Sequence, residues 1–261
     1  MTAAAAAPEA GEPVPVLTEV VDGLLVVTIN RPHARNAINT VTAVAIGAAM
    51  DRLDEDRSLV AGIITGAGGT FCAGMDLKAF AVHGLPDKVD DVLRHGCRKP
   101  LVAAIEGIAV GGGLELALIA DLLVAARDAR FGSPEVKFGL FPGGGALLRL
   151  PRLLPQSVVT ELALTGELMS AEAAHTHGLV VRLCDPGRTL HAALELAGAI
   201  ARNAPLGVDA TLRLLRRAPG RTEEELWAEQ VELVDAVFHS EDAQEGARAF
   251  AEKRPPEWSG R

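Results

Sequence analysis

Two short apolar segments, residues 60–65 and 101–105, each lead into a cluster of glycines. Their length, their branched side chains and the glycines that follow them are typical of buried β-strands. Two more segments of this kind lie at residues 122–126 and 180–183. Helical patterns lie between and after these strands, at residues 155–164, 171–177 and 190–203. The alternation of strand and helix predicts an α/β fold.

The chain begins with an alanine-rich segment, residues 1–13, that has neither the basic start nor the long apolar stretch of a signal peptide. We expect this segment to be a flexible tail. The two apolar segments after it, residues 14–21 and 24–29, are separated by an Asp-Gly pair, which predicts a β-hairpin. Charges or glycines interrupt every long apolar stretch, so we expect no membrane span.

Helical patterns alone fill residues 204–261, whereas residues 14–203 carry the α/β pattern. We therefore expect a core followed by a C-terminal helical region. An apolar stripe in this region is formed by Leu226, Trp227, Val231, Leu233, Val234, Val237 and Phe238. Such a stripe must be covered, either by the chain's own core or by another subunit.

The composition excludes several classes of protein. The chain has 25 basic and 34 acidic residues, a net charge of -9, and an aromatic content of 3%, so we expect no nucleic-acid partner. The three cysteines, Cys72, Cys97 and Cys184, are widely spaced and form no C-x-x-C pair. We therefore expect no disulfide framework and no metal site, and a reducing cytoplasm fits this pattern.

Three glycines at positions 111–113 stand between a strand and an apolar helix expected over residues 114–120. Glycine lets the backbone approach a ligand closely, and free N–H groups at a helix start attract negative charge, so this is a candidate oxyanion site. A glycine turn that only serves close packing gives the same pattern. Glu115 tips the balance toward function, because a carboxylate on an apolar helix is seldom buried without a partner or a task.

A second candidate carboxylate, Glu135, follows Pro134 in a turn-like segment. The proline favours an extended Ser133, so we expect Glu135 on irregular backbone and not on a helix face. On its own, Glu135 reads as a surface acid that pairs with Lys137. Together with Glu115 it gains a function, because two carboxylates in different environments can divide the acid and base roles of one reaction.

These segments resemble the enoyl-CoA hydratase (crotonase) family. The resemblance is carried by residues 30–39 (NRPHARNAIN), 64–78 (ITGAGGTFCAGMDLK), 111–121 (GGGLELALIAD) and 131–145 (FGSPEVKFGLFPGGG). The motifs agree in order and spacing, with Glu135 twenty positions after Glu115 as in the family's hydratases. The resemblance runs from about residue 16 to the end of the chain. It implies a spiral α/β core of ββα turns with a C-terminal helical region.

The resemblance also implies roles for individual residues. Backbone N–H groups at Met75 and Gly112 would form an oxyanion hole for a thioester carbonyl. The segment Met75, Asp76, Leu77 and Lys78 would lie along the acyl-CoA, with Gly112 also in the substrate site. Lys78 could contact a phosphate, although a solvated surface lysine would look the same.

The activity implied is enoyl-CoA hydration, in which Glu115 acts as base toward water and Glu135 delivers the α proton. Coenzyme A would enter as part of the substrate, with no separate cofactor and no metal. The family implies a homotrimer or a dimer of trimers. Residues 141–155 and 239–261 look like members that dehydrate 3-hydroxyacyl-CoA such as carnitinyl-CoA. Isomerases share the oxyanion hole, and a non-catalytic acyl-CoA-binding member is the remaining alternative, which the presence of both glutamates disfavours.

Overall fold

The computed structural model describes residues 14–86 and 88–261, so the tail expected over residues 1–13 lies outside the described residues. A six-stranded sheet forms the centre of the molecule, in the order β1-β2-β3-β4-β6-β9. Its strands are β1 (Val16–Val21), β2 (Leu24–Ile29), β3 (Ala61–Gly66), β4 (Leu101–Ile105), β6 (Leu122–Ala126) and β9 (Arg182–Cys184). The predicted hairpin is confirmed, because β1 pairs antiparallel with β2, whereas the other strands pair in parallel.

A second sheet is made of three very short strands in the order β5-β7-β8. They are β5 (Ile108–Val110), β7 (Arg130–Gly132) and β8 (Met169–Ser170). The chain passes from β4 of the large sheet to β5 of the small one, and again from β6 to β7, so it winds between two sheets. This winding gives the spiral of ββα turns that the family resemblance implies, and it confirms the predicted α/β class.

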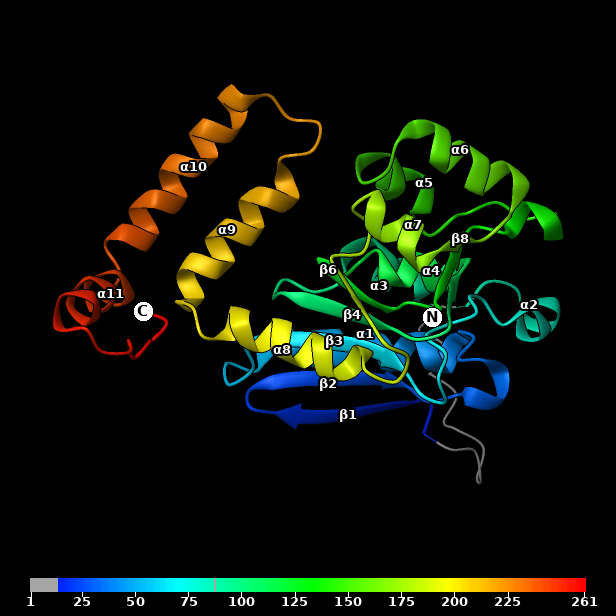
Figure 1. Cartoon of the computed structure of the whole chain (residues 1–261), viewed down its shortest axis with the longest axis horizontal. Coiled ribbons are helices and arrows are strands. Elements are labelled where there is room, and N and C mark those ends of the chain that lie inside the picture. Colours follow the sequence, from blue (N-terminus) through cyan, green and yellow to red (C-terminus); the bar gives the residue numbers. More distant parts are fainter. Residues whose placement is uncertain (1–13, 87) are drawn as a thin grey trace, which may run out of the picture.

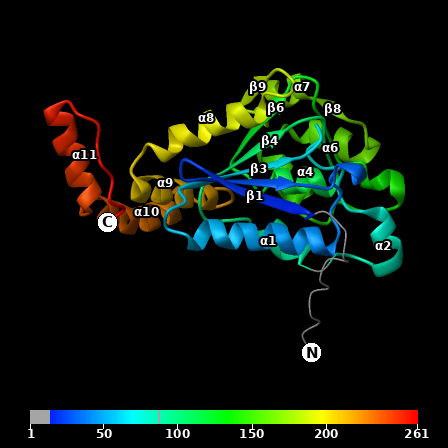
Figure 2. The ribbon, with the colours of Figure 1, turned by 90° about the horizontal axis from the view of Figure 1, so that it is seen from below.

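Helices cover both faces of the large sheet. Figure 2 shows α1 (Thr40–Glu55) on one side and α8 (Thr189–Ala201) on the other. Alternate side chains of each strand point to opposite faces, so Ile64 belongs to the larger core and Ile63 packs on the α8 side. Both faces are therefore apolar, as parallel strands between helices require.

Several shorter helices lie between and around the strands (Figure 1). These are η1 (Pro32–Ala34), α2 (Leu77–His83), α3 (Val89–His95), α4 (Gly112–Ala117), η2 (Glu135–Phe138), α5 (Ala146–Arg149), η3 (Leu150–Arg152), α6 (Gln156–Thr165) and α7 (Ala171–Thr176). The predicted buried helix over residues 114–120 is α4, which ends earlier, at Ala117. Its residues from Gly113 to Ala117 are all buried, so α4 is an interior helix.

Three C-terminal helices, α9 (Pro205–Arg217), α10 (Glu223–Phe238) and α11 (Glu241–Glu252), extend away from the core (Figure 1). Arg216 of α9 ties them to the core through both oxygens of Asp121, at 2.7 Å each. The stripe on α10 is not covered by the chain itself, since Trp227, Val231 and Phe238 keep 57%, 64% and 72% of their surface exposed. Among the described residues, no helix combines the length and the apolar character needed to cross a bilayer.

One local expectation is wrong. Glu135 does not lie on irregular backbone, because it begins the 3-10 helix η2. The Pro134 carbonyl accepts a hydrogen bond from the N–H of Lys137 over 2.9 Å, and the Glu135 carbonyl accepts one from Leu140 over 3.0 Å. Proline has a fixed φ that suits the start of a helical turn, and the extended bias that it places on Ser133 does not extend to Glu135, which follows the proline.

Candidate active site

Glu115 is buried on α4, with 5% of its surface exposed. Its Oε1 accepts hydrogen bonds from the backbone N–H groups of Gly144, over 2.7 Å, and Ala146, over 3.2 Å. Burial raises the pKa of Glu115 and the nearby charge of Glu135 adds to the rise, whereas the two N–H donors oppose it. A carboxylate with a raised pKa is suited to accept a proton and release it again.

The loop that binds Glu115 depends on its glycines. A Cβ atom at Gly144 would lie 2.4 Å from Oε2 of Glu115 and 2.4 Å from Cδ1 of Leu93. The next residue, Gly145, has a φ of 105°, a conformation that L side chains rarely adopt. The loop can therefore fold over Glu115 only because these two positions carry no side chain.

The side chain of Glu135 lies beside Gly111, the first of the three glycines at positions 111–113. Its Oε2 accepts a hydrogen bond of 2.8 Å from the Ser133 hydroxyl, and its Oε1 is buried without a hydrogen-bond partner among the described residues. A Cβ atom at Gly111 would lie 3.5 Å from that Oε1, so the free oxygen is directly beside the turn that leads into α4. A buried oxygen that is left unpaired in the folded chain is a candidate for contact with a substrate.

The structure excludes the interpretation of Glu135 as a surface acid that pairs with Lys137. Lys137, expected as its surface partner, instead forms an ion pair of 2.7 Å with Glu167. Glu167 is thirty residues further along the chain, so no local pattern pointed to it. This pair leaves Glu135 free of a neutralising lysine, and the 3-10 helix directs it toward α4.

Met75 and Gly112 bring two backbone N–H groups together. The Ile38 carbonyl accepts from Asp76 over 2.9 Å, and the Ile38 N–H donates to Gly74 over 2.8 Å. Ile38 and Met75 thus form a parallel β-bridge. The two hydrogen bonds of this bridge involve the neighbours of Met75 and do not use the Met75 N–H group. Gly112 is the first residue of α4, where an N–H has no partner within the helix. A Cβ atom at Gly112 would lie 3.5 Å from the Met75 nitrogen, so the two groups are close neighbours.

The other residues predicted for substrate binding have different environments. Asp76 caps α2 by accepting from Ala79 over 3.2 Å and pairs with Arg31 over 3.1 Å. Burial alone would raise the pKa of Asp76, but these two partners outweigh it and the pKa is lowered. Leu77 and Lys78 are exposed at the start of α2. The structure thus gives Asp76 a structural task, whereas the side chain of Lys78 is exposed to solvent.

Sequence reasoning missed the partners that hold this site. Gly144 and Ala146 bind Glu115 from 29 and 31 residues away, Ser133 orients Glu135, and Arg31 holds Asp76 from 45 residues away. In the sequence, the only indication of these partners was that most of them lie within the segments that resemble the family.

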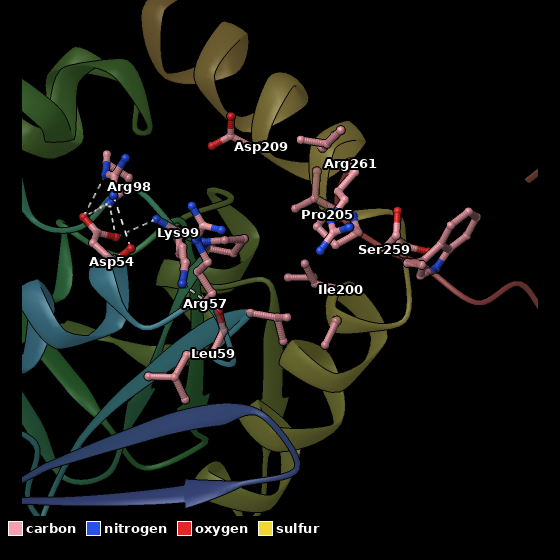
Figure 3. Close-up of a pocket in the computed structure, with 18 residues that line it drawn as sticks. Asp54, Arg57, Leu59, Arg98, Lys99, Ile200, Pro205, Asp209, Ser259 and Arg261 are labelled. Carbon is pink, nitrogen blue, oxygen red and sulfur yellow. Dashed lines mark hydrogen bonds and ion pairs between the residues drawn. The ribbon is translucent and has the colours of Figure 1, made fainter. Parts of the chain in front are cut away.

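A cavity of about 690 Å³ lies apart from the two glutamates, at the base of α9 (Figure 3). The Asp54 carboxylate at its edge accepts from the N–H groups of Arg98 and Lys99, at 2.9 and 3.1 Å. The Lys99 ammonium donates to the carbonyls of Asp56 and Leu59, at 2.7 Å each. These charged groups are engaged within the fold, and we do not place the active site there.

A model of the enoyl-CoA hydratase/isomerase family matches residues 19–261. The chain belongs to this family. An enoyl-CoA hydratase of Mycobacterium tuberculosis is 42% identical over 249 residues, covering 91% of this chain and 93% of that relative. A carnitinyl-CoA dehydratase of Salmonella arizonae is 42% identical over 251 residues, covering 91% and 95%.

Solved structures of enoyl-CoA hydratases have the same fold as this chain. The crystal structure of an enoyl-CoA hydratase from Mycobacterium marinum superimposes with a TM-score of 0.90 at 50% identity, covering 95% of this chain and all of that one. An enoyl-CoA hydratase from Bacillus anthracis reaches the same TM-score at 29% identity. The fold and family expected from the sequence motifs are therefore confirmed.

Proposed function

We propose that this protein catalyses the reversible addition of water to the 2,3 double bond of an enoyl-CoA thioester. The observation that carries the proposal is the pair of glutamates in unequal environments beside two close backbone N–H groups. Glu115 is held by Gly144 and Ala146, whereas Oε1 of Glu135 has no hydrogen-bond partner within residues 14–86 and 88–261. Relatives named enoyl-CoA hydratase support the same activity.

The N–H groups of Met75 and Gly112 would bind the thioester oxygen, which gains negative charge as the enolate forms. Glu115 accepts a proton from water as the water oxygen bonds to C3. Glu135 then donates a proton to C2, and the enolate returns to a thioester. The second water proton remains on the new hydroxyl group. A proton then passes from Glu115 back to Glu135, by way of solvent, so both carboxyl groups return to their starting states and one water is added in total. The same steps in reverse release water from a 3-hydroxyacyl-CoA.

In this mechanism the backbone N–H groups polarise the carbonyl, so it requires neither a metal nor a redox cofactor. Coenzyme A enters as part of the substrate. We propose that Asp76, Leu77 and Lys78 line its path, with the exposed Lys78 ammonium available to a phosphate group. Asp76 would contribute through the position of α2, because its carboxylate already binds Arg31.

Dehydration of carnitinyl-CoA is the second candidate, favoured by the relative of that name at 42% identity. Both reactions use the same groups, so substrate turnover must decide between them. We suggest a panel of enoyl-CoA and 3-hydroxyacyl-CoA thioesters, followed at the absorbance of the conjugated thioester. Turnover of simple enoyl-CoA supports hydration, and turnover of carnitinyl-CoA alone supports the dehydratase. Binding without any turnover would indicate a non-catalytic acyl-CoA-binding protein.

We also propose that the protein assembles as a homotrimer or as a dimer of trimers. The support is the apolar surface of α10, which its own core does not cover.

We further propose a cytoplasmic location. The state of the cysteines fits it, since Cys72, Cys97 and Cys184 all carry free thiols and two of them are buried.

A further inference from the structure

Arg149, the last residue of α5, carries a half-buried guanidinium that has no carboxylate partner within 4.0 Å among the described residues. Instead, Nη2 donates to the carbonyl of Leu93, and Nη1 donates to the carbonyl of Gly144 over 3.2 Å. Burial lowers the pKa of Arg149, and the nearby Glu115 counteracts this shift. A cation is seldom withdrawn from water merely to bind carbonyl groups. Its placement calls for an explanation beyond packing.

The two carbonyls connect Arg149 to the active site. Gly144 is the residue whose N–H binds Oε1 of Glu115 over 2.7 Å. The Gly144 carbonyl thus accepts from Arg149, and the Gly144 N–H donates to Glu115. By holding the carbonyl, the guanidinium fixes the orientation of Gly144 and of the N–H group that binds the glutamate. The contact to Leu93 anchors the same guanidinium on α3, which packs against Gly144. Arg149 therefore connects two segments that enclose Glu115.

Charge adds a second effect. Glu115 faces Glu135 from η2 and Arg149 from α5, and the two act in opposite directions. The negative charge of Glu135 raises the pKa of Glu115, whereas the positive charge of Arg149 lowers it. Arg152 of η3 acts on Arg149 and is itself exposed.

We propose that Arg149 is a positioning residue for Glu115, acting through the Gly144 peptide and the Leu93 carbonyl. This inference rests on the proposed hydratase function, in which Glu115 is the base. The hydrogen bonds described for Arg149 go to backbone carbonyl groups and not to the Glu115 carboxylate. The contribution of Arg149 is to keep the base in the orientation and the charge state that proton transfer needs.

Three variants test the proposal. Arg149→Gln removes the charge and the bridge between the two carbonyls. Arg149→Lys keeps the charge but lacks the planar fork. Arg152→Gln is the matched control, because it removes an equal charge from an exposed position next to Arg149. For each variant, kcat, KM and the pH dependence of kcat/KM are measured with an enoyl-CoA, and Tm is measured alongside.

We expect Arg149→Gln to lower kcat by about 10- to 100-fold, because a misplaced base impairs proton transfer, with KM changed by less than about threefold. The acidic limb of kcat/KM should move to higher pH, since loss of the cation raises the pKa of Glu115. Arg149→Lys should restore the position of this limb while recovering only part of kcat. Arg152→Gln should leave all of these quantities near wild type.

A folded Arg149→Gln variant with wild-type kcat and an unmoved acidic limb would overturn the proposal. So would unfolding of both Arg149 variants under assay conditions with Arg152→Gln intact, because Arg149 would then serve stability alone. A separate readout is the carboxyl NMR titration of glutamate-labelled protein, with Glu115→Gln used to assign the signal. If wild type hydrates no thioester, the hydratase proposal fails, whereas an unchanged Glu115 titration in Arg149→Gln refutes the inference about Arg149.

Discussion

The Ser133 hydroxyl donates a hydrogen bond of 2.8 Å to Oε2 of Glu135. This bond fixes the carboxyl group so that its other oxygen, Oε1, is buried beside Gly111 and has no hydrogen-bond partner in the described part of the chain. A proton carried on Oε1 would therefore face the turn that supplies the candidate oxyanion hole. The relationship explains how an acid on a four-residue helix can be held precisely enough for proton transfer.

Glu135→Gln keeps the size of the side chain but replaces the carboxyl group with an amide, which cannot deliver a proton. We expect hydration turnover to fall by roughly 10² to 10⁴, with little change in CoA binding. Glu167→Gln is the control, because Glu167 is the exposed partner of Lys137. Turnover near wild type in Glu135→Gln, measured with a purified enoyl-CoA, would show that Glu135 is not the proton donor.

The raised pKa of Glu115 predicts a pH effect on stability. The folded state binds a proton more tightly than the unfolded state, whose glutamate has a pKa near 4.5. Stability from this group is therefore present below that value and is lost as the pH rises through the folded pKa. Glu115→Gln can still accept the N–H bonds of Gly144 and Ala146 but carries no buried charge. We expect its Tm to equal or exceed that of wild type at pH 8.

The difference in Tm should shrink as the pH falls toward 4.5, where wild-type Glu115 is protonated as well. Thermal melts of both proteins over this range measure the effect, and turnover of Glu115→Gln should be strongly reduced at every pH. A variant that is less stable than wild type by the same margin at pH 8 and pH 5 would show that the charge of Glu115 does not oppose folding.

Arg216 is expected to hold the C-terminal helices on the core. It binds both oxygens of Asp121 at 2.7 Å and donates to the carbonyl of Cys97 over 2.7 Å. Arg216→Ala should lower the free energy of unfolding by about 2 kcal/mol, because these partners are only partly exposed to water. Arg213→Ala, on the same helix, removes a single exposed pair at 4.0 Å and should change stability by less than about 0.5 kcal/mol. Equal effects in denaturant titrations would contradict this assignment.

The apolar surface of α10 should be covered by neighbouring subunits. Wild type is expected to show the mass of a trimer or a hexamer by light scattering. Val231→Glu places a charge at a position that is 64% exposed in the single chain, and should weaken assembly. Glu232→Gln changes the charge of the next residue by one unit of the opposite sign and should not. A monomeric wild type with full activity would refute this expectation.

Local patterns predicted the long elements well, and they pointed to Glu115 as a buried acid. Length and branching located β3 and β4, and the single acid of an apolar helix located Glu115. The strands of the small sheet have two or three residues. This length is too short to show the alternation of apolar and polar residues by which a strand is recognised in a sequence. The groups that bind the site are distant in sequence: Arg31 meets Asp76 over 45 residues, and Arg149 meets Leu93 over 56. Such contacts arise from the winding of the chain, and a single sequence does not display them.

The central claim is that the N–H groups of Met75 and Gly112 hold the thioester oxygen beside the two glutamates. Gly112→Pro deletes one donor at the first position of α4, where proline is tolerated in helices. Met75→Ala is the control, because it alters the side chain and keeps the N–H. Tm and oligomer mass establish that both variants are folded.

The decisive measurement is the kcat for hydration of an enoyl-CoA by folded Gly112→Pro. Loss of one oxyanion donor typically lowers turnover on the order of 10² to 10³, and we predict a fall of at least that size, with Met75→Ala within a few-fold of wild type. Hydration at the wild-type rate by a correctly folded Gly112→Pro would contradict the account, because the glycine segment would then be only a packing turn.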